Sequence, residues 1–184
     1  MKQKDQLKHT LVYSSPQQVQ RVQETIQDEK RIIQHKFTSE EDATKKDPRY
    51  GGRTEREYLL HNFDEGVYDI LVAIRCLDEG VDVPSTRTAI LMCSTGNPKE
   101  YIQRRGRVLR RFPGKDKAVI YDFIVIPDLG TEEMFDEYES KIVQSQFQRI
   151  EEFVDDSLNS SETSRELFRI KLKYKIIGSA VHAR

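Results

Sequence analysis

Five arginines lie within residues 104–111, in the segment QRRGRVLRR. At about 100° per residue, Gln103, Arg107 and Arg110 would share one narrow stripe of a helix. Two neighbouring guanidinium groups suit a polyphosphate, because each binds phosphate oxygens through parallel hydrogen bonds. Gly106 flanks the stripe and costs a helix interior roughly 1 kcal/mol relative to Ala, but its missing side chain would let another surface approach closely. The spacing predicts a site for phosphate chemistry, since a general basic patch would need neither the glutamine nor the glycine.

Alternating strands and helices must position this segment. Apolar runs rich in β-forming residues predict five buried strands, in residues 9–15, 31–37, 68–74, 88–94 and 117–127. Helices are expected to open at Ser15-Pro16, to span residues 54–63, and to run from Asn97 through Arg110. This order predicts an α/β fold, a parallel sheet with helices on both faces. Such sheets bind ligands at loops beyond the carboxyl ends of their strands.

Two segments depart from the alternation. Residues 38–53 carry almost no apolar side chains and end in Pro and Gly-Gly, so they predict a solvated loop whose length indicates function or mobility. After Pro127 a long acidic helix is expected, broken at residues 157–163. Its apolar face would carry Met134, Tyr138, Ile142, Ile150, Phe153 and Leu158. We therefore expect one α/β domain over residues 1–127 and an acidic helical C-terminal extension over residues 128–184.

Charge is distributed unevenly along the chain, although the net charge is −1. Residues 99–117 hold eight basic and two acidic side chains, whereas residues 128–166 hold twelve acidic and three basic ones. This asymmetry indicates a basic working face and an acidic appendage for packing or partner docking. No apolar run approaches the ~18 residues that span a membrane, and Cys76 and Cys93 lack metal-ligand spacing. We expect a cytoplasmic protein with no metal site of its own and no membrane partner.

Three segments resemble successive motifs of superfamily 2 helicases and translocases. QRRGRVLR (103–110) resembles motif VI, Q/H-x-x-G-R-x-x-R, and TLVYSS (10–15) resembles motif IV. ILVAIRCLDEGVDVP (70–84) resembles motif V in the form found in UvrB and in restriction-enzyme helicase subunits. The motifs occur in the expected order, each with its predicted strand, over residues 9–127. The resemblance implies the second, C-terminal RecA-like lobe of a DEAD/DEAH-type helicase.

The resemblance also implies roles for individual residues. Arg107 and Arg110 would be arginine fingers that stabilise transition-state charge on ATP, and Gln103 would sense the γ-phosphate. Gly80 and Asp82 would lie at the nucleotide cleft, with Asp82 near the ribose hydroxyls. Contacts to the nucleic-acid backbone would come from Ser14, Ser15, Arg75, Ser94, Thr95 and Arg104.

Plainer alternatives stay open for some of these residues. Arg104 could be an ordinary surface charge. Asp82 precedes Val-Pro and could cap a turn. Ser14 and Ser15 could cap the helix that follows them.

The motif set is incomplete within this sequence. A phosphate-binding GxxxxGK[ST] and a DExx motif are both missing from it, and superfamily 2 motors carry these on a first RecA-like lobe. We therefore expect the chain to work with the N-terminal lobe of the same full-length protein, which would bind ATP with Mg²⁺, and to be inactive alone. DNA is favoured over RNA because motif V resembles that of DNA-repair and restriction motors.

Two other classes of function are alternatives to the motor lobe. The first is a non-catalytic nucleic-acid-binding or adaptor module with a helicase-like fold. The second is an unrelated doubly wound domain for a small anionic ligand. The second would need a Gly-rich strand–helix turn, and neither Gly51-Gly52 nor Gly96 stands in that context.

Overall fold

A computed structural model describes residues 7–29, 31–74, 82–92, 106–126 and 137–173. The chain divides into two compact units, residues 1–123 and 124–184. Each unit has a hydrophobic core of its own. The first unit contains the sheet and the motif-bearing segments.

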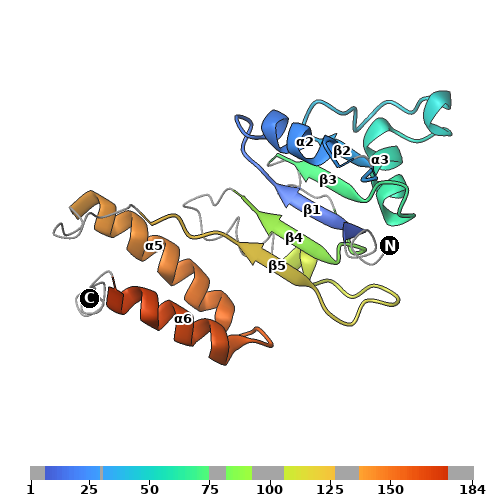
Figure 1. Ribbon diagram of the computed structural model, residues 1–184. Coiled ribbons are helices and arrows are strands. Elements are labelled where there is room, and N and C mark those ends of the chain that lie inside the picture. Colours follow the sequence, from blue (N-terminus) through green and yellow to red (C-terminus); the bar gives the residue numbers. More distant parts are fainter. Residues whose placement is uncertain (1–6, 30, 75–81, 93–105, 127–136, 174–184) are drawn as a thin grey trace. The chain divides into compact units, whose positions relative to one another are not determined.

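Unit 1 is built on a five-stranded parallel sheet with the strand order β2-β3-β1-β4-β5 (Figure 1). Its strands are β1 (Thr10–Tyr13), β2 (Gln34–Phe37), β3 (Ile70–Ala73), β4 (Thr88–Leu91) and β5 (Val119–Asp122). The central β1 and the adjacent β3 are buried along their whole length, as expected for strands covered on both faces. The predicted α/β fold is confirmed. Each strand is shorter than its predicted segment, because an apolar run does not mark where pairing between strands stops.

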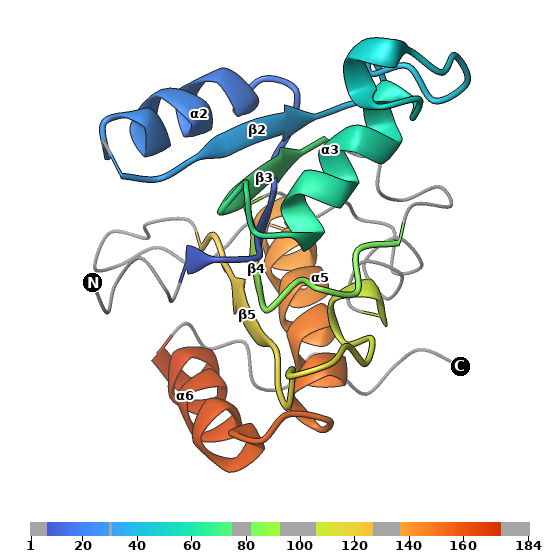
Figure 2. The same cartoon turned by 90° about the vertical axis from the view of Figure 1, so that its right-hand side faces the viewer.

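Helices α2 (Val19–Gln27) and α3 (Glu55–Asp64) lie on opposite faces of the sheet (Figure 2). Val22 of α2 packs with side chains of β1 and β3 in one core. On the other face, the Arg56 guanidinium of α3 lies 5.5 Å from the centre of the Phe37 ring. The connection from β1 to β2 and the connection from β2 to β3 run in opposite directions across the sheet. Right-handed crossovers therefore place their helices on opposite faces.

The two helices begin differently. Thr54 and Glu57 form a capping box at the start of α3, in which each side chain accepts a hydrogen bond from the other residue's backbone N–H. Helix α2 begins at Val19 rather than at Ser15-Pro16. Residues 16–18 form a turn, and the amides of Gln18 and Val19 donate to the Ser15 carbonyl. The N-cap position is Gln18, with no side-chain cap, so the alternative that Ser14 or Ser15 caps this helix is wrong.

Residues 38–53 form a defined projection between β2 and α3, seen at the upper right of Figure 1. The projection contains the 3-10 turn η1 (Pro48–Tyr50) and a bridge between Asp47 and Arg53. Gly51 and Gly52 close the turn with φ angles of 64° and 77°, which glycine adopts without the steric cost of a Cβ atom. The segment predicted as a solvated loop is largely exposed, although Thr38 and Glu41 are buried, and it has a hydrogen-bonded framework.

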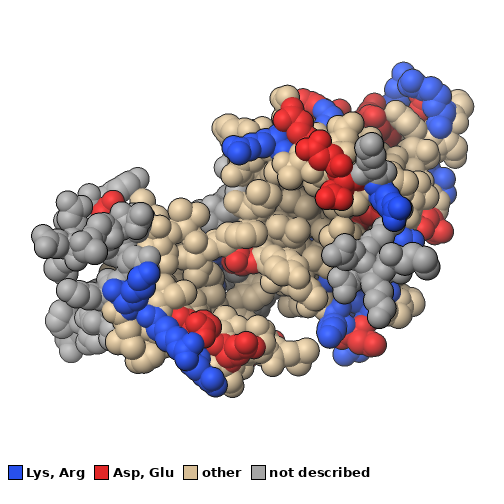
Figure 3. All heavy atoms as spheres, in the orientation of Figure 1, with Lys and Arg blue, Asp and Glu red and all other residues tan. Residues whose placement is uncertain are grey.

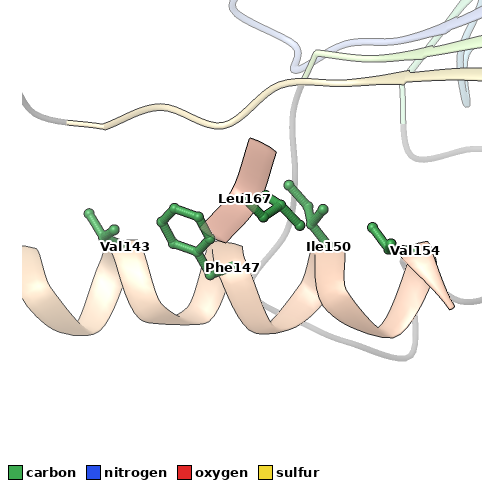
Figure 4. Close-up of a cluster of buried hydrophobic side chains, with 5 residues drawn as sticks. All are labelled: Val143, Phe147, Ile150, Val154 and Leu167. Carbon is green, nitrogen blue, oxygen red and sulfur yellow. The ribbon is translucent and has the colours of Figure 1, made fainter. Parts of the chain in front are cut away.

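Unit 2 contains α5 (Glu137–Val154) and α6 (Ser160–Lys173). One stripe of α5 is buried together with a side chain of α6 (Figure 4). The stripe consists of Val143, Phe147, Ile150 and Val154, and Leu167 comes from α6. None of the helices among the described residues is both long enough and apolar enough to cross a membrane.

The predicted apolar face of the first long helix was only partly right. Ile150 is buried as expected, whereas Ile142 is 41% exposed and Leu158 is 94% exposed. The true stripe passes through Val143, which lies about 100° around the helix from Ile142. Met134 and the side chain of Tyr138 are not among the parts of the chain that the structure describes. Two equally apolar neighbours cannot be ranked by periodicity alone.

The segment after β5 belongs to unit 2 rather than to a longer strand. β5 ends at Asp122, five residues before the end of the predicted strand at residue 127. Ile124 and Ile126 pack against the α5 core. Between them, the backbone of Val125 exchanges two hydrogen bonds with the side-chain amide of Gln146, at 3.0 and 2.9 Å. The Gln146 side chain thus makes the two backbone hydrogen bonds with Val125 that a neighbouring strand would otherwise make.

Candidate functional site

Two residues assigned to the nucleotide cleft meet in unit 1. Arg110 Nη1 donates to Asp82 Oδ2, and the two side chains form an ion pair. Their side chains remain 55% and 42% exposed, respectively. A pair with this exposure contributes about 0–1 kcal/mol. A ligand that offers phosphate to the arginine, or a hydroxyl to the carboxylate, can therefore separate the pair at low cost.

A buried valine anchors the arginine segment. Val108 is 1% exposed, while Arg107 before it is half-buried and Arg110 is exposed. The helix ends at Val108 and does not run through Arg110 as predicted, and the Arg110 amide instead donates to the Arg107 carbonyl at 3.3 Å in a turn. Pro113 lies five residues beyond this end and disfavours helical conformation only in Phe112, the residue before it.

Lys115 supplies a second anchor at the same place. Its ammonium donates to the carbonyl oxygens of Pro84 at 3.0 Å, Val108 at 2.6 Å and Arg110 at 2.9 Å. These bonds use all three protons of the group. Burial and the nearby Arg87 guanidinium lower the pKa of Lys115. One side chain therefore ties the last residue of motif V to the end of the motif VI helix.

Lys115 was missed by sequence reasoning. The residue lies outside the motif VI pattern, and its partners are backbone carbonyls, one of them 31 residues away. No spacing rule for side chains points to such a contact. The only local signal is the turn pair Pro113-Gly114 just before it, which predicts a change of chain direction.

Gly106 presents an open surface in the described part of the chain. A Cβ atom built at this position would meet no atom within 4 Å, and the residue is exposed. No atom of the described residues therefore requires a glycine here on steric grounds. The expectation that another surface approaches this position stays a prediction.

Ser14 and Ser15 follow β1 at the carboxyl edge of the sheet. Ser14 is 1% exposed, and its amide donates to the Ala73 carbonyl at 3.0 Å. Its Oγ is buried, and we find no hydrogen-bond partner for it among the described residues. Ser15 is half-buried, so it presents more surface to a ligand than Ser14 does. A backbone-contact role for either serine stays a prediction.

Several predicted site residues lie outside the described residues. These are Gln103, Gly80, Arg75, Ser94, Thr95 and Arg104. Within the described ranges, no group of three or more His, Cys, Asp or Glu side chains is placed to hold a metal ion.

The fold and the site together define a class of protein. A parallel five-stranded sheet carries motif-bearing segments at the carboxyl ends of its strands, and Asp82 and Arg110 bring motifs V and VI together. This is the arrangement of a RecA-like helicase lobe. Residues 5–112 match the model of the family described as Helicase conserved C-terminal domain, and the chain belongs to that family.

Comparison with curated proteins agrees with this assignment. The chain is 42% identical over 73 residues to the DNA 3'-5' translocase XPB2 of Sulfurisphaera tokodaii, covering 40% of this chain and 16% of that protein. It is 30% identical over 138 residues to the UvrABC system protein B of Francisella tularensis, covering 66% and 20%. The chain thus spans a fifth or less of the length of these two relatives. The resemblance to superfamily 2 helicases, including UvrB, is confirmed.

Solved structures show the same fold. The C-terminal part of the Fun30 ATPase domain aligns with a TM-score of 0.53 at 18% identity, covering 76% of this chain and 40% of that chain. The C-terminal domain of the DEAD-box protein Dbp5 aligns with a TM-score of 0.50 at 16% identity, covering 80% and 71%. At these identities the likeness concerns the fold alone.

Proposed function

We propose that this chain is the C-terminal motor lobe of an ATP-dependent DNA helicase or translocase. In this proposal Arg107 and Arg110 act on ATP that is held with Mg²⁺ on the N-terminal lobe of the same full-length protein. The observation that carries the proposal is the Asp82–Arg110 ion pair, because it joins a motif V carboxylate to a motif VI arginine. The names of relatives such as the DNA translocase XPB2 and the DNA helicase RecG support DNA as the track.

The weak ion pair suits a residue that must change partners. When the lobes close on ATP, the γ-phosphate offers Arg110 a doubly hydrogen-bonding partner, which binds more strongly than an exposed carboxylate. Asp82 is then available to accept a hydrogen bond from a ribose hydroxyl. Arg107 and Arg110 would stabilise charge that develops in the transition state, an effect on the order of 10³–10⁵ in rate for arginine fingers.

Movement along DNA would follow from this chemistry. ATP binding closes the cleft between lobes, and hydrolysis reopens it. The lobes hold the strand backbone alternately, so that each cycle of closure and opening shifts the protein along the DNA. In this lobe, the candidate contacts include Ser15 at the carboxyl edge of the sheet.

The test is DNA-stimulated ATP hydrolysis by the longest natural polypeptide that contains this sequence. Replacement Arg107→Ala should lower kcat several hundred-fold, while the affinity for DNA stays within about twofold, because a finger acts on the transition state. Arg165→Ala, at an exposed arginine of α6, is the matched control and should retain wild-type kcat. Equal DNA-stimulated activity of the Arg107→Ala protein and the wild type would reject Arg107 as a finger, and absence of that activity from both would reject the motor assignment and favour the adaptor. The 184-residue chain alone should show no ATP binding of micromolar affinity by titration calorimetry.

A further inference from the structure

Basic side chains gather on the projection between β2 and α3. Residues 42–53, which we call the basic loop, contain Lys45, Lys46, Arg49 and Arg53, all four of them exposed, and two acidic residues. Lys and Arg atoms cover this projection at the upper right of Figure 3. The motif resemblance assigns no role to the loop. The basic composition of the loop and its fixed conformation therefore need a separate explanation.

Hydrogen bonds fix the backbone at the start of the loop. The Asp42 carboxylate accepts from the amides of Thr44 at 2.7 Å and Lys45 at 3.0 Å. The Asp42 amide donates to the Glu55 carboxylate at 3.2 Å, and the Asp42 carbonyl accepts from the Arg56 amide at 3.2 Å. The start of the loop is thus tied to the first turn of α3.

The tip of the loop is held by Asp47 and Tyr50. Asp47 accepts from the Arg49 amide and guanidinium, both at 2.8 Å, and the bonds to Arg49 lower the pKa of Asp47 to about 2. The Tyr50 ring lies 5.2 Å from the Tyr58 ring of α3, and its hydroxyl donates to Glu55 at 3.2 Å. A ligand that binds here meets a preformed surface, so less ordering entropy opposes binding.

The four basic side chains of the loop differ in whether they form an ion pair. Arg49 is paired with Asp47 and lies 5.7 Å over the Tyr50 ring. Lys45, Lys46 and Arg53 form no ion pair with any carboxylate of the described ranges. Asp47 is paired with Arg49, and Asp42 accepts hydrogen bonds from backbone amides of the loop. With four cations and two carboxylates the loop has a net charge of +2, and Lys45, Lys46 and Arg53 are exposed on a fixed backbone.

The loop follows β2, and therefore projects from the carboxyl edge of the sheet, the edge at which Ser15 follows β1. We propose that the basic loop is a contact site for the phosphate backbone of DNA. The inference rests on the proposed function and adds a site that lies outside motifs IV, V and VI. Exposed cations at this edge match the negative charge of the DNA backbone, and phosphate contacts of this kind position a protein without reading base sequence.

The dependence of DNA affinity on salt concentration gives a quantitative expectation. Each phosphate that a cation neutralises on duplex DNA changes the slope of log Kobs against log salt by about −0.9. Lys45 and Lys46 together should therefore account for about two units of that slope.

The experiment measures fluorescence anisotropy of a labelled duplex with a single-stranded tail, titrated with the full chain at about 50 to 200 mM salt. The test variant is Lys45→Glu/Lys46→Glu. The matched control is Lys8→Glu/Lys117→Glu, which makes the same change in net charge at two exposed lysines that precede β1 and β5, at the amino edge of the sheet. A neutral variant, Lys45→Gln/Lys46→Gln, separates the loss of contact from repulsion, and circular dichroism checks that each variant folds.

We expect Kd of the test variant to rise at least about tenfold at the lowest salt, with the slope reduced by about two. The neutral variant should show the reduced slope with a smaller rise in Kd, and the control should shift Kd less than about threefold. An unchanged slope in the test variant, or equal shifts in test and control, would overturn the proposal. Competition by polyglutamate that is lost in the loop variant while DNA binding is kept would also overturn it, in favour of an acidic protein partner.

A failure of this inference can be told from a failure of the proposed function. In DNA-stimulated ATP hydrolysis by the longest natural polypeptide, the loop variant should raise the DNA concentration for half-maximal stimulation and keep kcat. Arg107→Ala should instead lower kcat. If the wild type shows no DNA-stimulated hydrolysis, the motor assignment fails, and the anisotropy comparison of the loop variant with its control still tests the loop by itself.

Discussion

Arg110 is the residue in which the predicted chemistry and the observed contacts coincide. Its guanidinium is exposed and paired with Asp82, while its carbonyl is fixed by Lys115 at 2.9 Å. The backbone is therefore held in place, and among the described residues the side chain is held by one weak ion pair. A residue built in this way can exchange a carboxylate for a phosphate without moving the chain beneath it.

His9 gives a prediction at the scale of one residue. It precedes β1 with a φ of 57°, and its ring packs edge-on against Phe63 at 5.6 Å. Burial, followed by the Arg87 guanidinium, lowers the pKa of His9 below its ordinary value of 6.5. The unfolded chain thus takes up a proton at higher pH than the folded chain does. The free energy of unfolding should therefore fall as the pH falls below about 6.5.

The replacement His9→Asn tests this, because asparagine tolerates a positive φ and does not titrate. Urea unfolding at pH 7 and pH 5 should show a smaller loss of stability in the variant than in the wild type. An equal loss in both proteins would show that His9 does not contribute to the pH dependence.

At the scale of elements, the arginine segment rests on two contacts that the motif does not contain. Val108 anchors the helix end in the core, and Lys115 bonds to carbonyls on both motif-bearing segments. Motif VI specifies which side chains are present. The contacts of Val108 and Lys115 determine where the chain places them.

Lys115→Met should lower the free energy of unfolding by about 1–3 kcal/mol, because three carbonyl groups lose a charged donor. The matched control is Lys117→Met, at an exposed lysine two residues further along the chain, where a change within about 0.5 kcal/mol is expected. Urea titrations followed by circular dichroism measure both variants. Equal stabilities of the two variants would contradict the anchoring role of Lys115.

The elements of the fold were predictable from local pattern, but the ends of these elements and the contacts between distant segments were not. Apolar runs located all five strands, and the helix expected over residues 54–63 is observed as α3 at Glu55–Asp64. Periodicity chose Ile142 instead of Val143 for the buried face of α5, because both neighbours are apolar. The Lys115 ammonium bonds to the Pro84 carbonyl, 31 residues away, and the Asp42 amide bonds to the Glu55 carboxylate, 13 residues away. No side-chain spacing encodes such contacts.

In the candidate site, too, the sequence motif identified the residues, whereas their contacts and exposure depend on packing. The motif resemblance named Asp82 and Arg110 separately, and the structure places them in contact. The resemblance also named Ser14, whose side chain is buried. A motif identifies the residue types that a family uses, but the solvent exposure of each one depends on the packing around it.

At the scale of the whole molecule, the chain supplies one side of the proposed nucleotide site. It carries the arginines and lacks the GxxxxGK[ST] sequence that cradles phosphates. In the proposed motor, ATP therefore lies between this lobe and an N-terminal one. Catalysis then depends on closure of the two lobes, because a guanidinium stabilises the transferring phosphoryl group only when it reaches the phosphate oxygens.

The most direct test of this account compares two ligands of the longest natural polypeptide that contains the sequence, at saturating DNA. One ligand is ADP, and the other is ADP with aluminium fluoride, which mimics the transferring phosphoryl group in the transition state. The account predicts that Arg107→Ala weakens binding of the fluoride complex several hundred-fold and leaves the affinity for ADP nearly unchanged. Unchanged affinity for both ligands, or an equal loss for both, would contradict the assignment of Arg107 as a finger on the phosphate.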